Sequence, residues 1–75
     1  MLNVLGRRNS SNVQKVLWAC DELHLSYERE DIGGEFGHNL SAKYLAMNPN
    51  GTIPTLIDSG RVLWESNAIV RYLCE

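Results

Sequence analysis

Two places in the sequence combine small polar or acidic side chains with the expected start of a helix. Ser10 and Ser11 precede the apolar stripe of one predicted helix, and Glu65 and Ser66 open another. Free N–H groups and the helix dipole favour an anion at such a start. The hydroxyl and the backbone N–H of a serine can both donate hydrogen bonds to a carboxylate, and a glutamate can accept hydrogen bonds from an ammonium group. The alternative is that these residues only cap their helices.

A proline stands near the start of an apolar segment over 52–57 that we interpret as a strand. Because Pro54 has no N–H to donate, it must lie at a strand end or edge. A cis bond between Ile53 and Pro54 would aim the N–H and C=O of Ile53 into a cleft. Only about 5–6% of X–Pro bonds in folded proteins are cis, so the residues alone favour a trans bond.

The elements that would position these residues follow from the apolar pattern and the turn signals. Trp18 points away from the apolar stripe of the first helix, so it is expected either to meet a covering partner or domain or to be exposed by chance. The stripe itself contains Val13, Val16, Leu17, Cys20 and Leu23 or His24. The expected order is a strand over 1–5, a loop over 6–11, this helix, a strand over 25–32 near a sheet edge, a glycine-rich loop over 33–39, a short helix over 41–47, a turn over 48–51, strands over 52–57 and 61–64 joined by a turn over 58–60, and a helix over 65–73.

That order of elements predicts the fold class. A strand-helix-strand unit calls for parallel pairing with a right-handed crossover, whereas the final hairpin must be antiparallel. We therefore expect an α/β domain of the order βαβ-(α)-ββα, with a four-stranded mixed sheet and helices on its faces. The 75 residues leave room for one domain.

Composition excludes several classes of partner. The formal net charge is −2, which gives no electrostatic reason to expect nucleic acid, and no apolar run is long enough to span a membrane. Cys20 and Cys74 do not form a C-x-x-C motif, and neither has a second metal ligand nearby, so no metal site is expected. Both are interpreted as core or interface thiols, and the cytoplasm is the expected compartment.

Two sequence blocks carry a resemblance to a known family. One is the run Asn48-Pro49-Asn50-Gly51-Thr52-Ile53-Pro54-Thr55-Leu56, and the other is Glu65-Ser66-Asn67-Ala68-Ile69 after Leu63-Trp64. Together, at the end of a βαβ unit, they resemble the thioredoxin-like N-terminal domain of glutathione S-transferases, over essentially the whole chain. The first helix is similar to the serine-type bacterial, theta and zeta members, and no tyrosine occurs in the first strand or its loop.

The resemblance implies roles for five residues in binding glutathione. It makes the Ile53–Pro54 bond cis, so that the loop pairs strand-like with the backbone of the glutathione cysteine. Glu65 and Ser66 are then expected to hold the γ-glutamyl end, which offers a carboxylate beside an ammonium. His38, in the glycine-rich segment that touches the glycine end in the family, is either a further ligand or a solvated loop histidine.

The resemblance also implies the catalytic group. Glutathione reacts as its thiolate, which a hydroxyl at the start of the first helix would stabilise. Counting back from Lys15-Val16 places this role on Ser10, with Ser11 as the alternative or as the N-cap. Arg7 and Arg8 either supply positive potential at the mouth of the cleft or form a solvated pair.

The resemblance predicts a transferase that attacks an electrophilic small molecule with glutathione. The alternative is a non-catalytic module that binds glutathione or another protein. A C-terminal helical domain, expected to be absent from residues 1–75, builds most of the electrophile pocket in the family. The isolated domain is therefore expected to be weakly active or inactive, with Trp18, Val70 and Cys74 left uncovered. A homodimer is expected, as is usual in the family.

Overall fold

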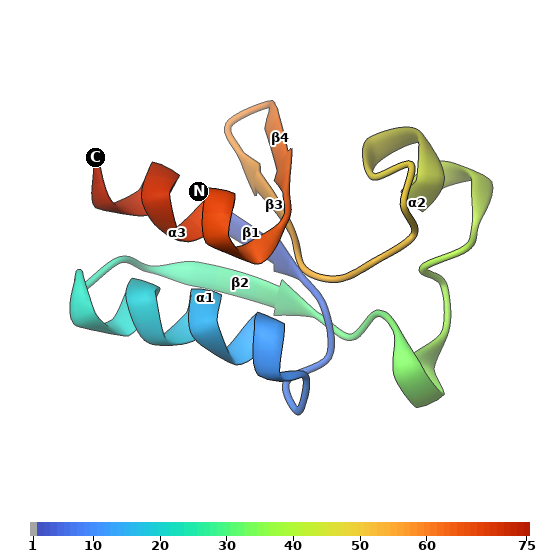
Figure 1. Ribbon diagram of the computed structural model, residues 1–75, viewed down its shortest axis with the longest axis horizontal. Coiled ribbons are helices and arrows are strands. Elements are labelled where there is room, and N and C mark those ends of the chain that lie inside the picture. Colours follow the sequence, from blue (N-terminus) through green and yellow to red (C-terminus); the bar gives the residue numbers. More distant parts are fainter. Residues whose placement is uncertain (1) are drawn as a thin grey trace.

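The computed structural model describes residues 2–75 and has a four-stranded mixed sheet with helices beside it (Figure 1). The strand order is β2-β1-β3-β4. β1 pairs in parallel with β2 and β3 pairs antiparallel with β4, as predicted. The structure adds an antiparallel pair between β1 and β3. The strands are β1 (Leu2–Leu5), β2 (Tyr27–Glu30), β3 (Thr55–Asp58) and β4 (Arg61–Trp64).

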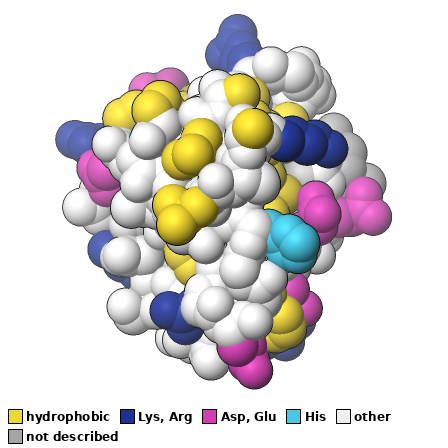
Figure 2. Space-filling view, turned by 90° about the vertical axis from the view of Figure 1, so that its right-hand side faces the viewer, with side chains coloured by type: hydrophobic (Ala, Val, Ile, Leu, Met, Phe, Trp, Pro, Cys, Tyr) yellow, Lys and Arg dark blue, Asp and Glu magenta, His cyan; other side chains and the backbone are white. Residues whose placement is uncertain are grey.

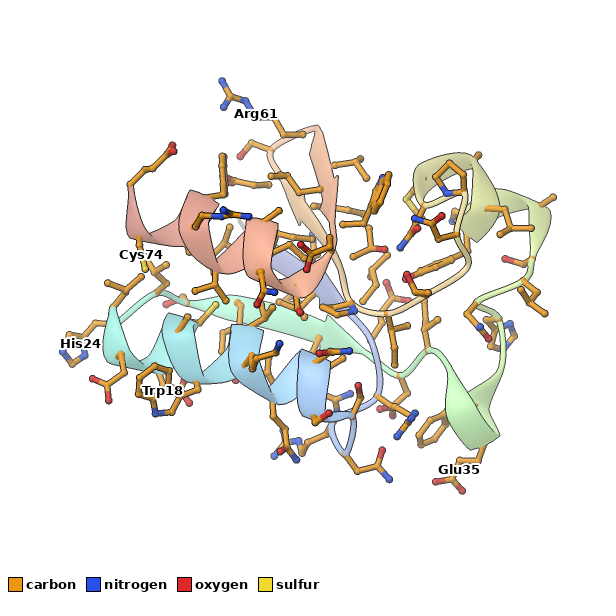
Figure 3. The ribbon with its side chains drawn as sticks, in the orientation of Figure 1. Trp18, His24, Glu35, Arg61 and Cys74 are labelled. Carbon is orange, nitrogen blue, oxygen red and sulfur yellow. The ribbon has the colours of Figure 1, made fainter. Side chains whose placement is uncertain are left out.

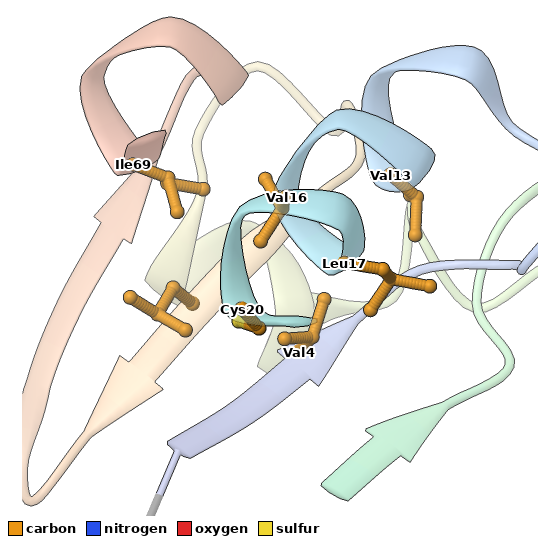
Figure 4. Close-up of a cluster of buried hydrophobic side chains, with 7 residues drawn as sticks. Val4, Val13, Val16, Leu17, Cys20 and Ile69 are labelled. Carbon is orange, nitrogen blue, oxygen red and sulfur yellow. The ribbon is translucent and has the colours of Figure 1, made fainter. Parts of the chain in front are cut away.

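Two helices cover one face of this sheet. They are α1 (Ser11–Glu22) and α3 (Ser66–Cys74), which lie side by side in Figure 1. The core between them and the sheet is a single apolar cluster, shown in Figure 4. Its fully or almost fully buried members are Val4, Val13, Val16, Leu17, Cys20, Leu56 and Ile69. The predicted stripe of the first helix is therefore confirmed up to Cys20.

The structure corrects the end of that stripe. α1 ends at Glu22, and Leu23 caps it with 40% of its surface exposed. His24 follows in a left-handed conformation with φ 56° and is exposed. The helix stops there because the chain must turn to enter β2, so neither Leu23 nor His24 joins the core.

β4 spans the predicted residues 61–64, whereas β2 is shorter than the sequence pattern indicated and β3 begins later. Of residues 25–32, which the pattern predicted as a strand, only the four residues of β2 form one. β2 lies at an edge of the sheet, as predicted. β3 begins after Pro54, because a proline has no N–H for the ladder, and 52–54 lie in a loop. Asp58 belongs to β3, so the hairpin turn contracts to Ser59 and Gly60, both with the positive φ that a two-residue type I′ turn requires. Met1 of the predicted first strand lies outside the described residues.

A short helix and a 3-10 turn lie beyond one end of the sheet. They are η1 (Gly34–Phe36) and α2 (Ala42–Met47), on the right in Figure 1. Tyr44 of α2 bonds to Thr55, whose side chain alternates with that of Leu56 and so points to the face opposite α1 and α3. This helix and Tyr44 therefore cover part of the second face.

The N-cap of α1 gives a stability prediction. Ser10 Oγ accepts from the N–H of Val13, whereas Ser11 is the exposed first residue of the helix. Ser10→Ala is expected to lower the free energy of unfolding by about 1 kcal/mol, because one helix N–H loses its partner. Ser11→Ala is the matched control and should change it by less than about 0.5 kcal/mol. Urea denaturation measures both, and equal effects would contradict the assignment of Ser10 as the cap.

The two thiols are expected to differ in reactivity. Burial, and secondly the charge of Asp21, raises the pKa of the Cys20 thiol from its ordinary value of 9.0, whereas Cys74 is exposed. A disulfide reagent at neutral pH should therefore label Cys74 in the folded chain and both thiols in urea, with Cys74→Ser as the control that leaves the folded chain unlabelled.

The same thiol gives a pH dependence with a definite sign. Below the ordinary pKa of 9.0 the Cys20 thiol is protonated whether the chain is folded or unfolded. As the pH rises through that value, the unfolded chain releases its proton first, so the free energy of unfolding should fall. A free energy of unfolding that rises with pH in this window would contradict the burial of Cys20. Equal labelling of both thiols in the folded chain, in the experiment above, would contradict it as well.

Candidate functional site

A hollow of about 360 Å³ opens where the start of α1 meets the loops before η1 and β3. Such a volume lies at the lower end of the range for small-molecule sites, about 300–1,000 Å³. It contains the predicted residues Ser10 and Ile53. The full lining is Arg7, Ser10, Asn12, Gly33, Gly34, Asn39, Gly51, Thr52 and Ile53.

Ser10 is buried at this hollow with 8% of its surface exposed. Its hydroxyl oxygen accepts from the N–H of Val13 at 3.5 Å, and its carbonyl accepts from the N–H of Gln14 at 2.9 Å. A hydroxyl has one hydrogen to donate as well as lone pairs that accept. Capping α1 therefore leaves the O–H of Ser10 free to donate to a ligand.

The loop before β3 brings an unpaired stretch of backbone to the same hollow. The Ile53–Pro54 peptide bond is cis. Among residues 2–75, neither the N–H nor the C=O of Ile53 takes part in a hydrogen bond. These groups lie beyond the end of the β3 ladder, which begins at Thr55, and can pair with an extended ligand as a strand would.

A buried hydrogen-bond network holds this loop in place. The Tyr44 hydroxyl donates to the carbonyl of Thr52 at 2.6 Å and bonds the Thr55 hydroxyl at 2.7 Å. Asn48 Nδ2 donates to the same carbonyl at 2.9 Å and to the Thr55 hydroxyl at 3.1 Å. Burial raises the pKa of Tyr44, so it keeps its proton as a donor. The sequence pattern did not predict this network, because it indicated only a short helix over 41–47 and a turn over 48–51.

Glu65 and Ser66 lie at the start of α3, as predicted. Glu65 is the N-cap, and one of its carboxylate oxygens accepts from the N–H of Asn67 at 2.8 Å. The Ser66 hydroxyl, 6% exposed, donates to Oδ1 of Asn12 at 3.4 Å. Since Asn12 lines the hollow, this bond joins the starts of α1 and α3 beside it.

Glu65 also has a backbone conformation that the sequence did not predict. Its φ is 77°, a region that side chains other than glycine rarely occupy. Such conformations cost about 1–3 kcal/mol and are concentrated at functional sites. The positive φ therefore favours a binding role for Glu65 over helix capping alone.

The structure does not bring His38 to this hollow. His38 is exposed and lines a separate space of about 370 Å³ with Leu5, Tyr44 and Met47. Its neighbour Asn39 lies at the candidate site instead and donates to the carbonyl of Gly51 at 2.8 Å. Figure 2 shows the α2 end of the molecule, where hydrophobic side chains gather among charged ones.

A second exposed region lies on the outer side of α1 and α3. Trp18 is 66% exposed and points outward from α1 (Figure 3). It borders a hollow of about 530 Å³ with Lys15, Asn67, Val70 and Arg71. Cys74 is exposed at the end of α3, while Val70 packs partly against the core. The outward direction of Trp18, expected from the helical pattern, is confirmed.

Neither a metal site nor a membrane-spanning helix is present in residues 2–75. No group of three or more histidine, cysteine, aspartate or glutamate side chains comes close enough together to hold an ion in this part of the chain. None of the described helices has the length and apolar character needed to cross a bilayer.

Comparison with known proteins identifies the family. The family model of the glutathione S-transferase N-terminal domain matches residues 9–75. Glutathione S-transferase GstB of Escherichia coli is 57% identical over 75 residues, covering 97% of this chain and 36% of that protein. Glutathione S-transferase 2 of Schizosaccharomyces pombe is 42% identical over 67 residues, which cover 85% of this chain and 29% of that protein.

Solved structures agree with this result. The theta class glutathione S-transferase of Xanthomonas axonopodis pv. citri, solved with glutathione bound, superimposes with a TM-score of 0.95 and 55% identity, over 97% of this chain and 35% of that one. An epsilon-class enzyme from the housefly gives a TM-score of 0.92 and 34% identity, over 97% and 34% of the two chains. The chain thus spans about a third of the length of the relatives it matches. It belongs to the glutathione S-transferase family, in which it corresponds to the N-terminal domain.

Proposed function

We propose that the chain binds glutathione and stabilises its thiolate for attack on an electrophilic small molecule. The observation that carries this proposal is the convergence of Ser10, the unpaired backbone of Ile53 and the Asn12–Ser66 bond at one hollow. Together they offer a hydrogen-bond donor for the thiolate, a strand-like partner for the cysteine backbone and a helix start for a carboxylate. The glutathione bound to the Xanthomonas relative supports the same ligand class.

The γ-glutamyl end of glutathione would occupy the start of α3. Its carboxylate matches the free N–H groups of the first helical turn. The Ser66 hydroxyl would donate to it as well on exchanging its present bond to Asn12 for one to the ligand. Its ammonium group matches Glu65, which uses one carboxylate oxygen to bond Asn67 and keeps the other available. The cysteine backbone would pair with the N–H and C=O of Ile53, in the manner of a strand added to a sheet edge.

The thiol of glutathione would then lie at the start of α1. Ser10 donates its free hydroxyl hydrogen to the sulfur, and the helix dipole favours the negative charge there. The thiol releases its proton to solvent, and the sulfur forms a bond to the electrophilic carbon. A leaving group departs with the electron pair where the electrophile has one. Ser11, exposed in the first turn of α1, is the alternative donor.

We propose that residues 1–75 are the glutathione-binding domain of a longer transferase. The relatives are about three times as long as this chain. A helical domain covering the exposed Trp18 and the hollow beside Val70 would account for apolar surface that this domain leaves open. The electrophile pocket would lie largely on that domain.

The compartment and the assembly stay predictions. Both cysteines are free thiols, which suits the reducing cytoplasm. Val62 and Trp64 on edge strand β4 are 42% and 40% exposed and supply apolar surface of the kind that homodimers bury.

The thiolate role of Ser10 gives a direct test. Ser10→Ala should raise the pKa of the bound glutathione thiol by about 1 to 2, because a hydrogen bond to an anion contributes about 1.5–3 kcal/mol. Titration of the ultraviolet absorbance of the thiolate measures this value in the complex. Ser11→Ala is the matched control and should leave it unchanged. The reverse pattern would transfer the role to Ser11, and no change in either variant would remove the hydroxyl from the mechanism.

The separation of binding from turnover gives a second test. The 75-residue chain is expected to bind glutathione but to conjugate a generic aromatic electrophile weakly or not at all, because the electrophile has no pocket. Isothermal calorimetry and an absorbance assay of the conjugate measure the two properties. Robust turnover by the 75 residues would contradict the two-domain proposal. Binding without activity in the longer protein as well would favour the non-catalytic module.

A further inference from the structure

The space beside His38 is a cleft that the proposed function does not use. It has a volume of about 370 Å³, and its lining comes from two parts of the chain. One part is Leu5 with residues 30–32, where the paired strands β1 and β2 end, and the other lies in the segment 38–47, which includes α2. None of these lining residues also lines the hollow assigned to glutathione. The cleft is therefore a separate candidate site.

The two parts of the chain bring opposite charges to the cleft. Glu30 is the last residue of β2, and Lys43 lies in α2. Neither side chain forms an ion pair within residues 2–75. Asp31 also lines the cleft, but its carboxylate is paired with Arg29. The cleft thus offers a carboxylate and an ammonium group that do not contact each other, so a ligand with both charges can lie between them.

Apolar side chains form the rest of the surface that a ligand would meet. Leu5 is buried, and Ile32 and Met47 are half-buried. Covering such surface with an apolar group of a ligand is favourable. The volume lies at the lower end of the range for small-molecule sites, so the cleft suits a small ligand.

We propose that this cleft binds an α-amino acid with an apolar side chain. The ammonium group of the ligand donates to Glu30, and its carboxylate accepts from Lys43 and from a ring N–H of His38. The apolar side chain lies against Leu5 and Met47. A ligand with only one charge leaves Glu30 or Lys43 unpaired, which is why a zwitterion fits the cleft better than an amine or a carboxylic acid does. This inference goes beyond the proposed function and does not depend on it.

The test uses L-leucine as the probe and nuclear magnetic resonance to locate it. Because the γ-glutamyl end of glutathione is itself an α-amino acid, leucine is titrated into the isotope-labelled 75-residue chain with excess glutathione present. Saturable shifts are expected for the backbone amides that line the cleft. Leucinamide lacks the carboxylate and isocaproate lacks the ammonium group, so each should bind about 10-fold more weakly or worse, as expected for losing a hydrogen bond between charged groups.

Variants of the two charged residues test their roles separately. Glu30→Gln and Lys43→Gln should each weaken leucine binding about 10-fold or more, because each leaves one charge of the ligand unpaired. Both residues are exposed, so the variants should keep the fold, which their amide spectra check. Glu28→Gln and Lys15→Gln remove the same charges at exposed positions outside the cleft and should leave the affinity for leucine unchanged.

The outcomes separate this inference from the proposed function. No saturable shift at the cleft, or leucine shifts only at Ile53 and Ser66 that excess glutathione abolishes, would overturn the second site. Equal effects of Glu30→Gln and Glu28→Gln would overturn it as well. The shifts that glutathione itself causes report on the proposed function, since they are expected at Ser10 and Ile53 and not at the cleft.

Discussion

The site depends on the packing of α1 and α3 side by side on one face of the sheet. Because apolar residues of both helices share one core with β1 and β3, their N-terminal ends are brought to the same edge of the domain. The Asn12–Ser66 hydrogen bond joins these ends directly. Two helix starts favour negative charge within one small region, and a ligand with a carboxylate and an incipient thiolate matches both.

The second requirement is a rigid loop beside those helix ends. A backbone N–H and C=O can bind a ligand strand only if the loop is held so that they form no hydrogen bonds within the protein. Two donors on the Thr52 carbonyl, from Tyr44 and Asn48, fix the residue before Ile53. The Thr55 hydroxyl anchors the other side of the loop to the same pair. This network of neutral groups thus holds the loop in place without adding a charge to the hollow.

The sequence could predict the parts of this arrangement that are local. Serine before an apolar stripe predicts a capped helix, and alternating turn and strand signals predict the order of elements. It could not predict the φ of Glu65, because tertiary packing and not the residue type imposes that conformation. It also could not predict the hydrogen bonds of Tyr44, whose partners lie 8 and 11 residues away. For His38 the sequence left two alternatives open, a ligand and a solvated loop histidine, because the direction of a loop side chain depends on backbone turns that periodicity does not record.

Charge gives the last step of the argument. The chain carries a net charge of −2, which would disfavour an anionic ligand if charge acted as an average over the molecule. The hollow instead has a single charged residue in its lining, and that residue is a cation. At the ionic strength of cells, interactions beyond about 8 Å are largely screened, so the local arrangement outweighs the total. The net charge of the domain is therefore no argument against an anionic ligand at this hollow, where Arg7 and the start of α1 supply local positive potential.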